Sequence, residues 1–256
     1  MIGVVLALAL AGSAEAQVAG ETFRDCETCP EMTQLIDGTA IGTYLVTRDE
    51  FAEYAADWDV PETSNCFIWI GKRASDSKEH GWADPGFEQA GDHPVVCVNW
   101  LEATGYADWL SEKTGQLYRL PTIEESRAAA FAGTQTRFWW GDSFDEVCQW
   151  ANVGDEVYRA AHPDDQRDVR IPCEDGFPFT SPVGAFPPNG LGLHDVVGNV
   201  YQWTNSCNKG DCSNAIFRGG AWNVPRPFHL SNEGEWADRI VLRGAAVGFR
   251  VMRDAE

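Results

Sequence analysis

Glycine and proline constrain this chain more than any other feature, because 25 glycines and 13 prolines interrupt its 256 residues. Both residue types end helices and favour turns, so this many of them exclude a helical bundle. Hydrophobic residues make up 44% of the chain and aromatic residues 12%, which is enough for a buried core and excludes global disorder. We therefore expect a folded, globular protein that is rich in loops.

The chain is strongly acidic, with 39 Asp and Glu against 19 Lys and Arg and a formal net charge of −20. Such a surface repels the phosphates of nucleic acids and disfavours docking on anionic membranes. We expect no nucleic-acid partner. The expected partner is a periplasmic protein or a small ligand.

The N-terminus has the features of an export signal. Residues 2–11, IGVVLALALA, form an apolar run too short to span a bilayer, and Ala14-Glu15-Ala16 follows as a small-x-small cleavage site. Residues 1–16 are thus predicted to be a signal peptide, and residues 17–256 a single domain. No Lys or Arg precedes the run, which leaves open a misassigned start codon, a weak signal or a buried N-terminal strand. We expect a periplasmic or secreted protein with no membrane insertion after cleavage.

The eight cysteines, an even number, fit an exported chain with disulfides. Cys26-Glu-Thr-Cys29 would suggest redox or metal chemistry in a reducing compartment, but a local disulfide is the simpler interpretation here. No second CxxC is present to complete a zinc site. Spacing alone does not decide connectivity, and the pairs we favour are Cys26 with Cys29, Cys66 with Cys97, Cys148 with Cys173, and Cys207 with Cys212.

Capping boxes predict three helices, each followed by apolar residues at helical spacing. The boxes are Thr47 with Glu50, Asn99 with Glu102, and Thr122 with Glu125. Beyond Gly133 helical periodicity disappears, and short strands are predicted at 138–140, 199–203, 216–218 and 247–252. The stretch 141–190 is irregular, so we expect disulfides or metal ions to hold it. The fold class is α+β.

Several characteristic segments follow one another over about residues 23–253: FRDCETCPEM, HPVVCVNWLEATGYADWLSEKTGQLYRLPTIEE, FWWGD, SPVGAFPPNGLGLHDVVGNVYQW, FRGGAWN and VGFRVMR. Read in this order, they resemble the formylglycine-generating enzyme, or sulfatase-modifying factor, family. The resemblance implies a mixed α+β fold that is related to C-type lectins and has few regular elements.

The resemblance also implies two calcium sites, each made of two side chains and two backbone carbonyls. The first would consist of the side chains of Asn152 and Asp175 with the carbonyls of Val153 and Phe177, and the second of the side chains of Asp195 and Gln202 with the carbonyls of Gly198 and Val200. Calcium prefers such hard oxygens. At the second site the family often has Asn and Glu where this chain has Asp195 and Gln202, an exchange that keeps one negative charge. The alternative is that EDGF, in the first site, is an ordinary turn and that GNVYQW, in the second site, is a core strand.

Active members of the family hold copper with two cysteines five residues apart, just after the RGGSW-type segment, and oxidise a substrate cysteine to formylglycine. In this chain the corresponding positions are Val224 and His229. Thiolates select Cu(I), and an isopropyl group and an imidazole do not replace them. We therefore expect no copper and no formylglycine generation. Cys207 and Cys212, also five apart, precede this segment and are better explained as a disulfide.

The segment 222–243 corresponds to the catalytic cleft of the family. A ligand-binding cleft here would be formed by Trp222, Asn223, Arg226, Trp236 and Arg239, and the candidates for any surviving chemistry are His229, Glu233 and Glu235. Two functions stay open. One is an accessory or binding protein stabilised by calcium and disulfides, and the other is an oxidoreductase or maturation enzyme that uses different chemistry. We favour the first, because no base–nucleophile or metal constellation stands out.

Overall fold

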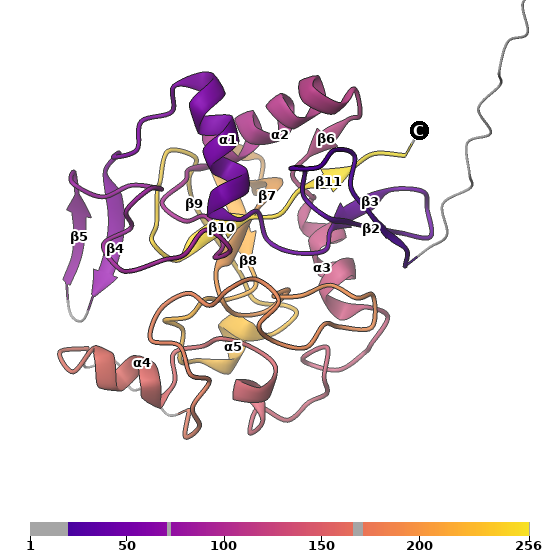
Figure 1. Ribbon diagram of the computed structural model, residues 1–256. Helices are drawn as coiled ribbons and strands as arrows, with labels where there is room; N and C mark the ends of the chain where they lie inside the picture. The colour runs from indigo at the N-terminus through magenta and orange to yellow at the C-terminus, as the bar shows by residue number, and fades with distance from the viewer. Residues whose placement is uncertain (1–19, 71–72, 166–170, 256) are drawn as a thin grey trace, which may run out of the picture.

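The computed structural model describes residues 20–70, 73–165 and 171–255, so the predicted signal peptide, 1–16, lies outside the described residues (Figure 1). The helices are α1 (Arg48–Trp58), α2 (Trp100–Thr114), α3 (Ile123–Phe131), the 3-10 turn η1 (Val147–Gln149), α4 (Glu156–Ala161) and α5 (Pro227–Leu230). The strands are β1 (Thr22–Phe23), β2 (Met32–Gln34), β3 (Ala40–Gly42), β4 (Cys66–Ile70), β5 (Arg73–Ser77), β6 (Tyr118–Arg119), β7 (Tyr201–Asn208), β8 (Asp211–Arg218), β9 (Glu235–Arg239), β10 (Val247–Phe249) and β11 (Met252–Arg253). The expected α+β class is confirmed.

All three predicted capping boxes form, and they begin α1, α2 and α3. In each box the N-cap side chain accepts a hydrogen bond from the N3 backbone, and the N3 glutamate accepts one from the N-cap backbone. Gly115 ends α2 in the left-handed conformation, with φ of 74°. No helix in the described part of the chain is both long and apolar enough to cross a bilayer.

Three sheets organise the strands. The five-stranded sheet has the order β1-β2-β3-β11-β6, the four-stranded sheet has the order β10-β7-β8-β9, and β4 pairs with β5 as a hairpin. In the four-stranded sheet β10 runs parallel to β7, while β7, β8 and β9 pair antiparallel. This sheet forms one side of the candidate cleft: β9 lies at its edge, and Trp236 pairs there with Phe217.

The strand predictions beyond Gly133 are correct only in part. The prediction of a strand at 138–140 is wrong: the segment is a turn in which Phe138 and Gly141 exchange two backbone hydrogen bonds and the Phe138 ring stacks on Trp140. The expected strand 247–252 divides into β10 and β11, which join different sheets. A left-handed turn at Gly198 and Asn199 delays the start of β7 to Tyr201.

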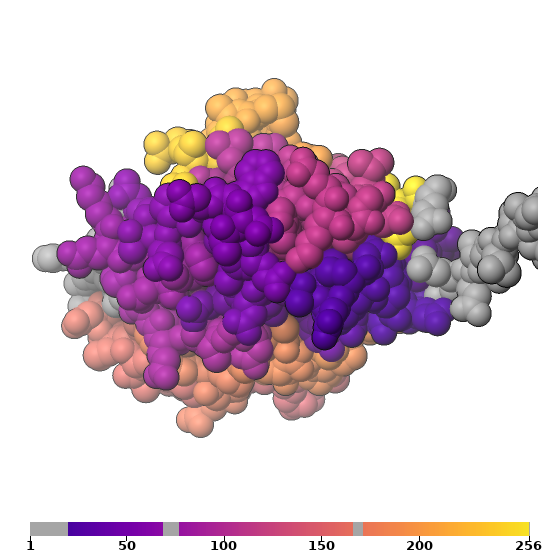
Figure 2. Space-filling model, turned by 45° about the horizontal axis from the view of Figure 1, so that its top comes forward, coloured from indigo at the N-terminus to yellow at the C-terminus, as the bar shows by residue number. Residues whose placement is uncertain are grey.

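The predicted disulfides all form: Cys26–Cys29, Cys66–Cys97, Cys148–Cys173 and Cys207–Cys212. Cys148–Cys173 joins the two irregular segments that carry the residues of the first candidate calcium site. Cys207–Cys212 closes the β7–β8 hairpin, whose orange tip projects from the packed body of the molecule in Figure 2. Helices α1 and α2 lie at one end of the molecule, and α4 and α5 lie at the other (Figure 1).

Candidate functional site

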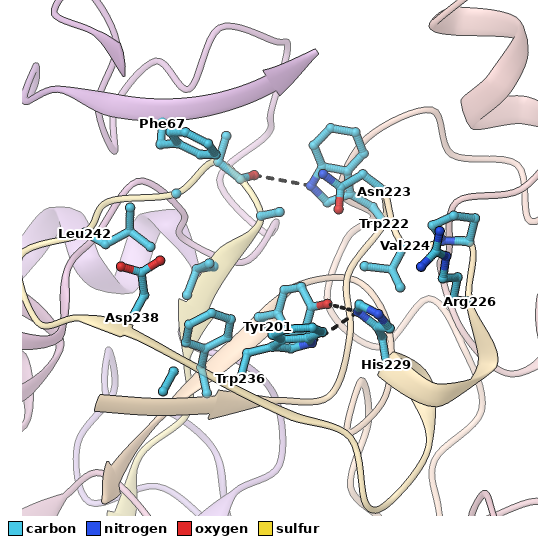
Figure 3. A pocket seen from close by; sticks show the side chains of 17 residues that line it. Phe67, Tyr201, Trp222, Asn223, Val224, Arg226, His229, Trp236, Asp238 and Leu242 are labelled. Carbon is cyan, nitrogen blue, oxygen red and sulfur yellow. Dashed lines mark hydrogen bonds between the residues drawn. The ribbon is translucent and has the colours of Figure 1, made fainter. Parts of the chain in front are cut away.

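A cavity of about 610 Å³ lies between the four-stranded sheet and the segment that leads into α5. Its walls are mostly aromatic and aliphatic (Figure 3). Val224 and His229, which the resemblance places at the copper-cysteine positions, both line it and are five positions apart in the chain. Trp222, Asn223, Arg226 and Trp236, four of the residues named for a ligand-binding cleft, line it too.

Two glycines allow the chain to form this wall. Gly219 and Gly220 have φ of 101° and 77°, a conformation that favours glycine. A Cβ on Gly220 would lie 2.4 Å from Leu230 of α5, so the turn packs directly against that helix. Pro227 occupies the first turn of α5, where its missing N–H costs nothing. The RGGAW segment therefore brings Trp222 and His229 to one cavity.

His229 is held by two hydrogen-bonding side chains. Its Nδ1 lies 2.9 Å from the hydroxyl of Tyr201 and 3.1 Å from Nε1 of Trp236, and Figure 3 shows both contacts. An indole N–H only donates, so Nδ1 accepts and the neutral ring carries its proton on Nε2. The Nδ1 lone pair is thus engaged within the protein, which removes it as a metal ligand.

Trp222 forms a rigid wall of the cavity. It is 1% exposed, its Nε1 donates to the carbonyl of Ala245 at 3.2 Å, and its rings contact those of Tyr158 and Phe179. Arg239, which was also named for the cleft, does not line the cavity. It lies at the end of β9, where it pairs with Asn214.

The other two candidate catalytic residues lie apart from His229. Glu233 lines a second cavity of about 530 Å³ together with Arg137 and Ser231. Glu235 forms an ion pair with Arg127 of α3. The three candidates therefore do not converge on one substrate position.

Several residues of the cavity were missed from the sequence, and Asp238 and Phe67 show why. Asp238 lies two residues after Trp236 on β9, and strand alternation could have placed it on the same face. Its carboxylate lies near Leu242 in Figure 3 and accepts the backbone N–H of Arg239 at 2.7 Å. Phe67 comes from β4, far away in the chain, and no local signal could have identified it.

The first candidate calcium site contains a buried acceptor without a donor. Asn152 is fully buried, and its Nδ2 donates to the carbonyl of Phe179 at 2.8 Å, while its Oδ1 has no partner among the described residues. The Asp175 carboxylate accepts the backbone N–H groups of Val153 at 2.7 Å and Phe177 at 2.8 Å. Burial, and next the charge of Asp155, raise the pKa of Asp175 to about 7. An orphaned oxygen and a buried carboxylate fit a hard cation.

The second candidate site is different, because each of its side-chain oxygens has a hydrogen-bond donor among the described residues, unlike Oδ1 of Asn152. Nε2 of Gln202 donates to the backbone carbonyl of Asp195 at 2.9 Å, and its Oε1 accepts from Nε of Arg250 at 3.2 Å. Oδ2 of Asp195 accepts the N–H of Gly184 at 2.8 Å. Gly198 and Val200 lie in the same turn, in which Gly198 approaches the Asn152 backbone too closely for any Cβ. Among residues 20–70, 73–165 and 171–255, no cluster of three or more His, Cys, Asp or Glu could hold a metal.

The α+β architecture, the RGGAW turn and the cavity beside it define a protein of the sulfatase-modifying factor class. The chain belongs to the sulfatase-modifying factor enzyme 1-like domain family, which matches residues 6–255. The formylglycine-generating enzyme of Mus musculus is 34% identical over 139 residues, which are 54% of this chain and 33% of that protein. The chain thus spans about a third of the length of that relative.

Other relatives extend the match. The inactive C-alpha-formylglycine-generating enzyme 2 of Bos taurus is 34% identical over 208 residues, which are 80% of this chain and 63% of that protein. Among solved structures, PvdO from Pseudomonas aeruginosa has a TM-score of 0.73 at 27% identity and covers 93% of this chain and 100% of its own. CarF, with a TM-score of 0.58 at 22% identity over 85% of this chain and 87% of its own, shares the fold.

Proposed function

We propose that this protein does not generate formylglycine and that it acts as an exported accessory or binding protein. The supporting observation is the cavity at the family's copper position. Val224 contributes no donor atom there, and Nδ1 of His229 is engaged by Tyr201 and Trp236. Cu(I) requires soft donors, so this set does not fit copper. The similarity to a bovine relative named as inactive supports the same proposal.

The chemistry of the cavity favours an apolar or aromatic ligand, either a small molecule or a side chain of a periplasmic protein. Trp222, Tyr201, Phe217 and Trp236 contribute aromatic surface, and burying an apolar group against such walls is favourable. Trp236 is 43% exposed, so it lies at the mouth, where a partner can reach it.

We further propose one calcium ion at the first candidate site, held by Asn152 Oδ1, Asp175 and the carbonyls of Val153 and Phe177. The ion would give the orphaned Asn152 oxygen a partner and neutralise the buried carboxylate. The disulfides support an oxidising location, periplasmic or extracellular, because such bonds are rare in reducing compartments.

The alternative function, an oxidoreductase or maturation enzyme, has one observation in its favour. The Tyr201 hydroxyl and the His229 imidazole share a hydrogen bond at the cavity, and such a pair can move a proton to or from a bound substrate.

The first test is copper loading and activity. Purified protein should take up no stoichiometric Cu(I) from bicinchoninate and should convert no cysteine in a sulfatase-derived peptide, followed by mass spectrometry. The double variant Val224→Cys/His229→Cys should gain a Cu(I) site, whereas Val224→Ala/His229→Ala controls for altered packing. Stoichiometric copper in the wild-type chain, or formylglycine in the peptide, would overturn the proposal.

The second test is ligand binding in the cavity, with the fluorescent apolar anion 1-anilinonaphthalene-8-sulfonate as the probe. Trp236→Ala should weaken its binding several-fold, because a wall of the cavity is lost. Trp58→Ala removes an indole that is 54% exposed on α1, away from the cavity, and should leave binding unchanged. Equal binding by both variants would place the probe elsewhere and count against the cavity as the ligand site.

A further inference from the structure

We infer that the second calcium loop of the family is closed in this protein by an internal network of Arg250, Gln202 and Asp195, and that it takes no calcium. The inference goes beyond the proposed function, which places one ion at the first site. It depends on the direction of the hydrogen bonds made by one carboxamide.

Gln202 offers one acceptor and one donor end, and both are in use. Its Oε1 accepts from the Arg250 guanidinium at 3.2 Å, and its Nε2 donates to the Asp195 carbonyl at 2.9 Å. Rotating the amide would set its NH₂ against the guanidinium N–H and its oxygen against a carbonyl oxygen. Both contacts would then be repulsive, so the orientation is fixed.

This orientation turns the wrong end of Gln202 toward a calcium ion. The end of the carboxamide that faces the backbone of the candidate loop, at the Asp195 carbonyl, is the NH₂ group, and a cation is repelled by an N–H dipole. A glutamate has two acceptor oxygens and could serve the arginine with one and an ion with the other. The glutamine at this position has a single acceptor oxygen, and that oxygen already accepts from Arg250.

Arg250 cannot move aside to release Gln202. Its guanidinium is fully buried, with Nη1 donating to the carbonyls of Gly42 at 2.5 Å and Thr43 at 3.0 Å and Nη2 donating to the carbonyl of His194 at 2.5 Å. These carbonyls lie at the end of β3 and beside Asp195, while Gln202 lies on β7. The guanidinium thus cross-links the five-stranded and four-stranded sheets.

The same side chain places a positive charge in the segment that contains Asp195. Its buried guanidinium donates to four oxygen acceptors, which are three backbone carbonyls and Oε1 of Gln202. A buried cation held by several oxygen acceptors does here what a calcium ion does in a loop of this kind. The candidate ligands Gly198 and Val200 then only shape the turn.

The experiment counts calcium per chain by equilibrium dialysis with elemental analysis, on the mature protein and on single variants. Wild type should bind one ion, and Asp175→Asn should bind none. Asp195→Asn should bind as many as wild type, and Gln202→Glu should bind one more. Gln135→Glu adds the same charge at an exposed position and controls for nonspecific attraction.

The outcomes separate the two claims. A wild-type chain that binds no calcium would overturn the proposal of an ion at the first site. The inference about the second site would still be tested by the difference in bound calcium between Gln202→Glu and wild type. Loss of one ion in Asp195→Asn would overturn the inference, as would a folded Gln202→Glu that gains none. Circular dichroism identifies any variant that does not fold, and Gln202→Glu keeps the inference testable if Asp195→Asn fails to fold.

Discussion

Two halves of this molecule are held together in different ways. The half under α1 and α2 has a core of aromatic rings in mutual contact, among them Phe51, Tyr106 and Phe249. In the half between residues 138 and 199, η1 and α4 are the only regular elements among the residues that the structure describes. There the Cys148–Cys173 disulfide and the Asp155 carboxylate, which accepts N–H groups of Val157 and Tyr158, connect the loops.

The candidate cavity lies where these halves meet. Tyr201 and Trp236 belong to the four-stranded sheet, whereas Trp222 packs on Tyr158 of the irregular half. The N–H of Gly154 donates to the carbonyl of Val224 at 3.0 Å, one residue from the candidate calcium ligand Val153. The comparison teaches that the wall of the cavity depends on cross-links as well as on the apolar core.

The largest expected effect is in the aromatic core. Trp203 is fully buried, packs edge-on against Phe217 and donates from Nε1 to the carbonyl of Val98 at 3.2 Å. Trp203→Ala should lower the free energy of unfolding by about 3–5 kcal/mol, measured by urea denaturation. Trp58→Ala, at a half-exposed indole, should change it by less than about 0.5 kcal/mol. Similar losses of unfolding free energy in both variants would show that burial of aromatic side chains is not the main source of stability in this half.

The next effect should appear in the irregular half. Cys148→Ser/Cys173→Ser opens a loop with a sequence separation of 25 and should destabilise the protein by about 3 kcal/mol. Hydrogen exchange should accelerate first within 141–180, while α1 and α2 stay protected. Removing Cys207–Cys212, whose separation is 5, is the matched control with a smaller loop-closure effect. Uniform loss of protection would contradict the division into two halves.

The sequence predicted the regular half better than the irregular one, for a physical reason. Capping boxes such as Thr47 with Glu50 are local, so they specify where a helix begins without any tertiary information. The turn at Phe138 has aromatic residues typical of a strand, yet tertiary ring packing decides its conformation.

The candidate site shows the same limit. Trp222, Arg226 and His229 were predicted through the family resemblance and the RGGAW segment. Phe67 and the pairing of Tyr201 with His229 depend on contacts between distant strands and α5. The direction of the Gln202 amide depends on Arg250, 48 residues away, so no local pattern could reveal it.

Removing calcium should produce a smaller effect that is confined to the irregular half. Chelation with EDTA should lower the free energy of unfolding by about 2–3 kcal/mol if the free ion was near 100 times its dissociation constant. The loss should be absent in Asp175→Asn, which already lacks the ion. Because Gly154 connects this loop to Val224, chelation should also weaken binding of the fluorescent probe in the cavity. An equal response of wild type and Asp175→Asn to EDTA would show that the ion is not held there.

The smallest effect should come from a helix cap in the regular half, and it tests whether the halves are independent. The Thr47 hydroxyl accepts the backbone N–H of Glu50 at 3.2 Å, and Thr47→Ala leaves that donor without its partner. We expect a loss of about 1 kcal/mol, with Thr47→Ser close to wild type. Calcium affinity and probe binding should not change, because α1 contributes no candidate calcium ligand and, in the described part of the chain, no residue that lines the cavity. A weaker calcium affinity in Thr47→Ala would mean that the aromatic core transmits strain across the boundary, and the two halves would then have to be treated as one cooperative unit.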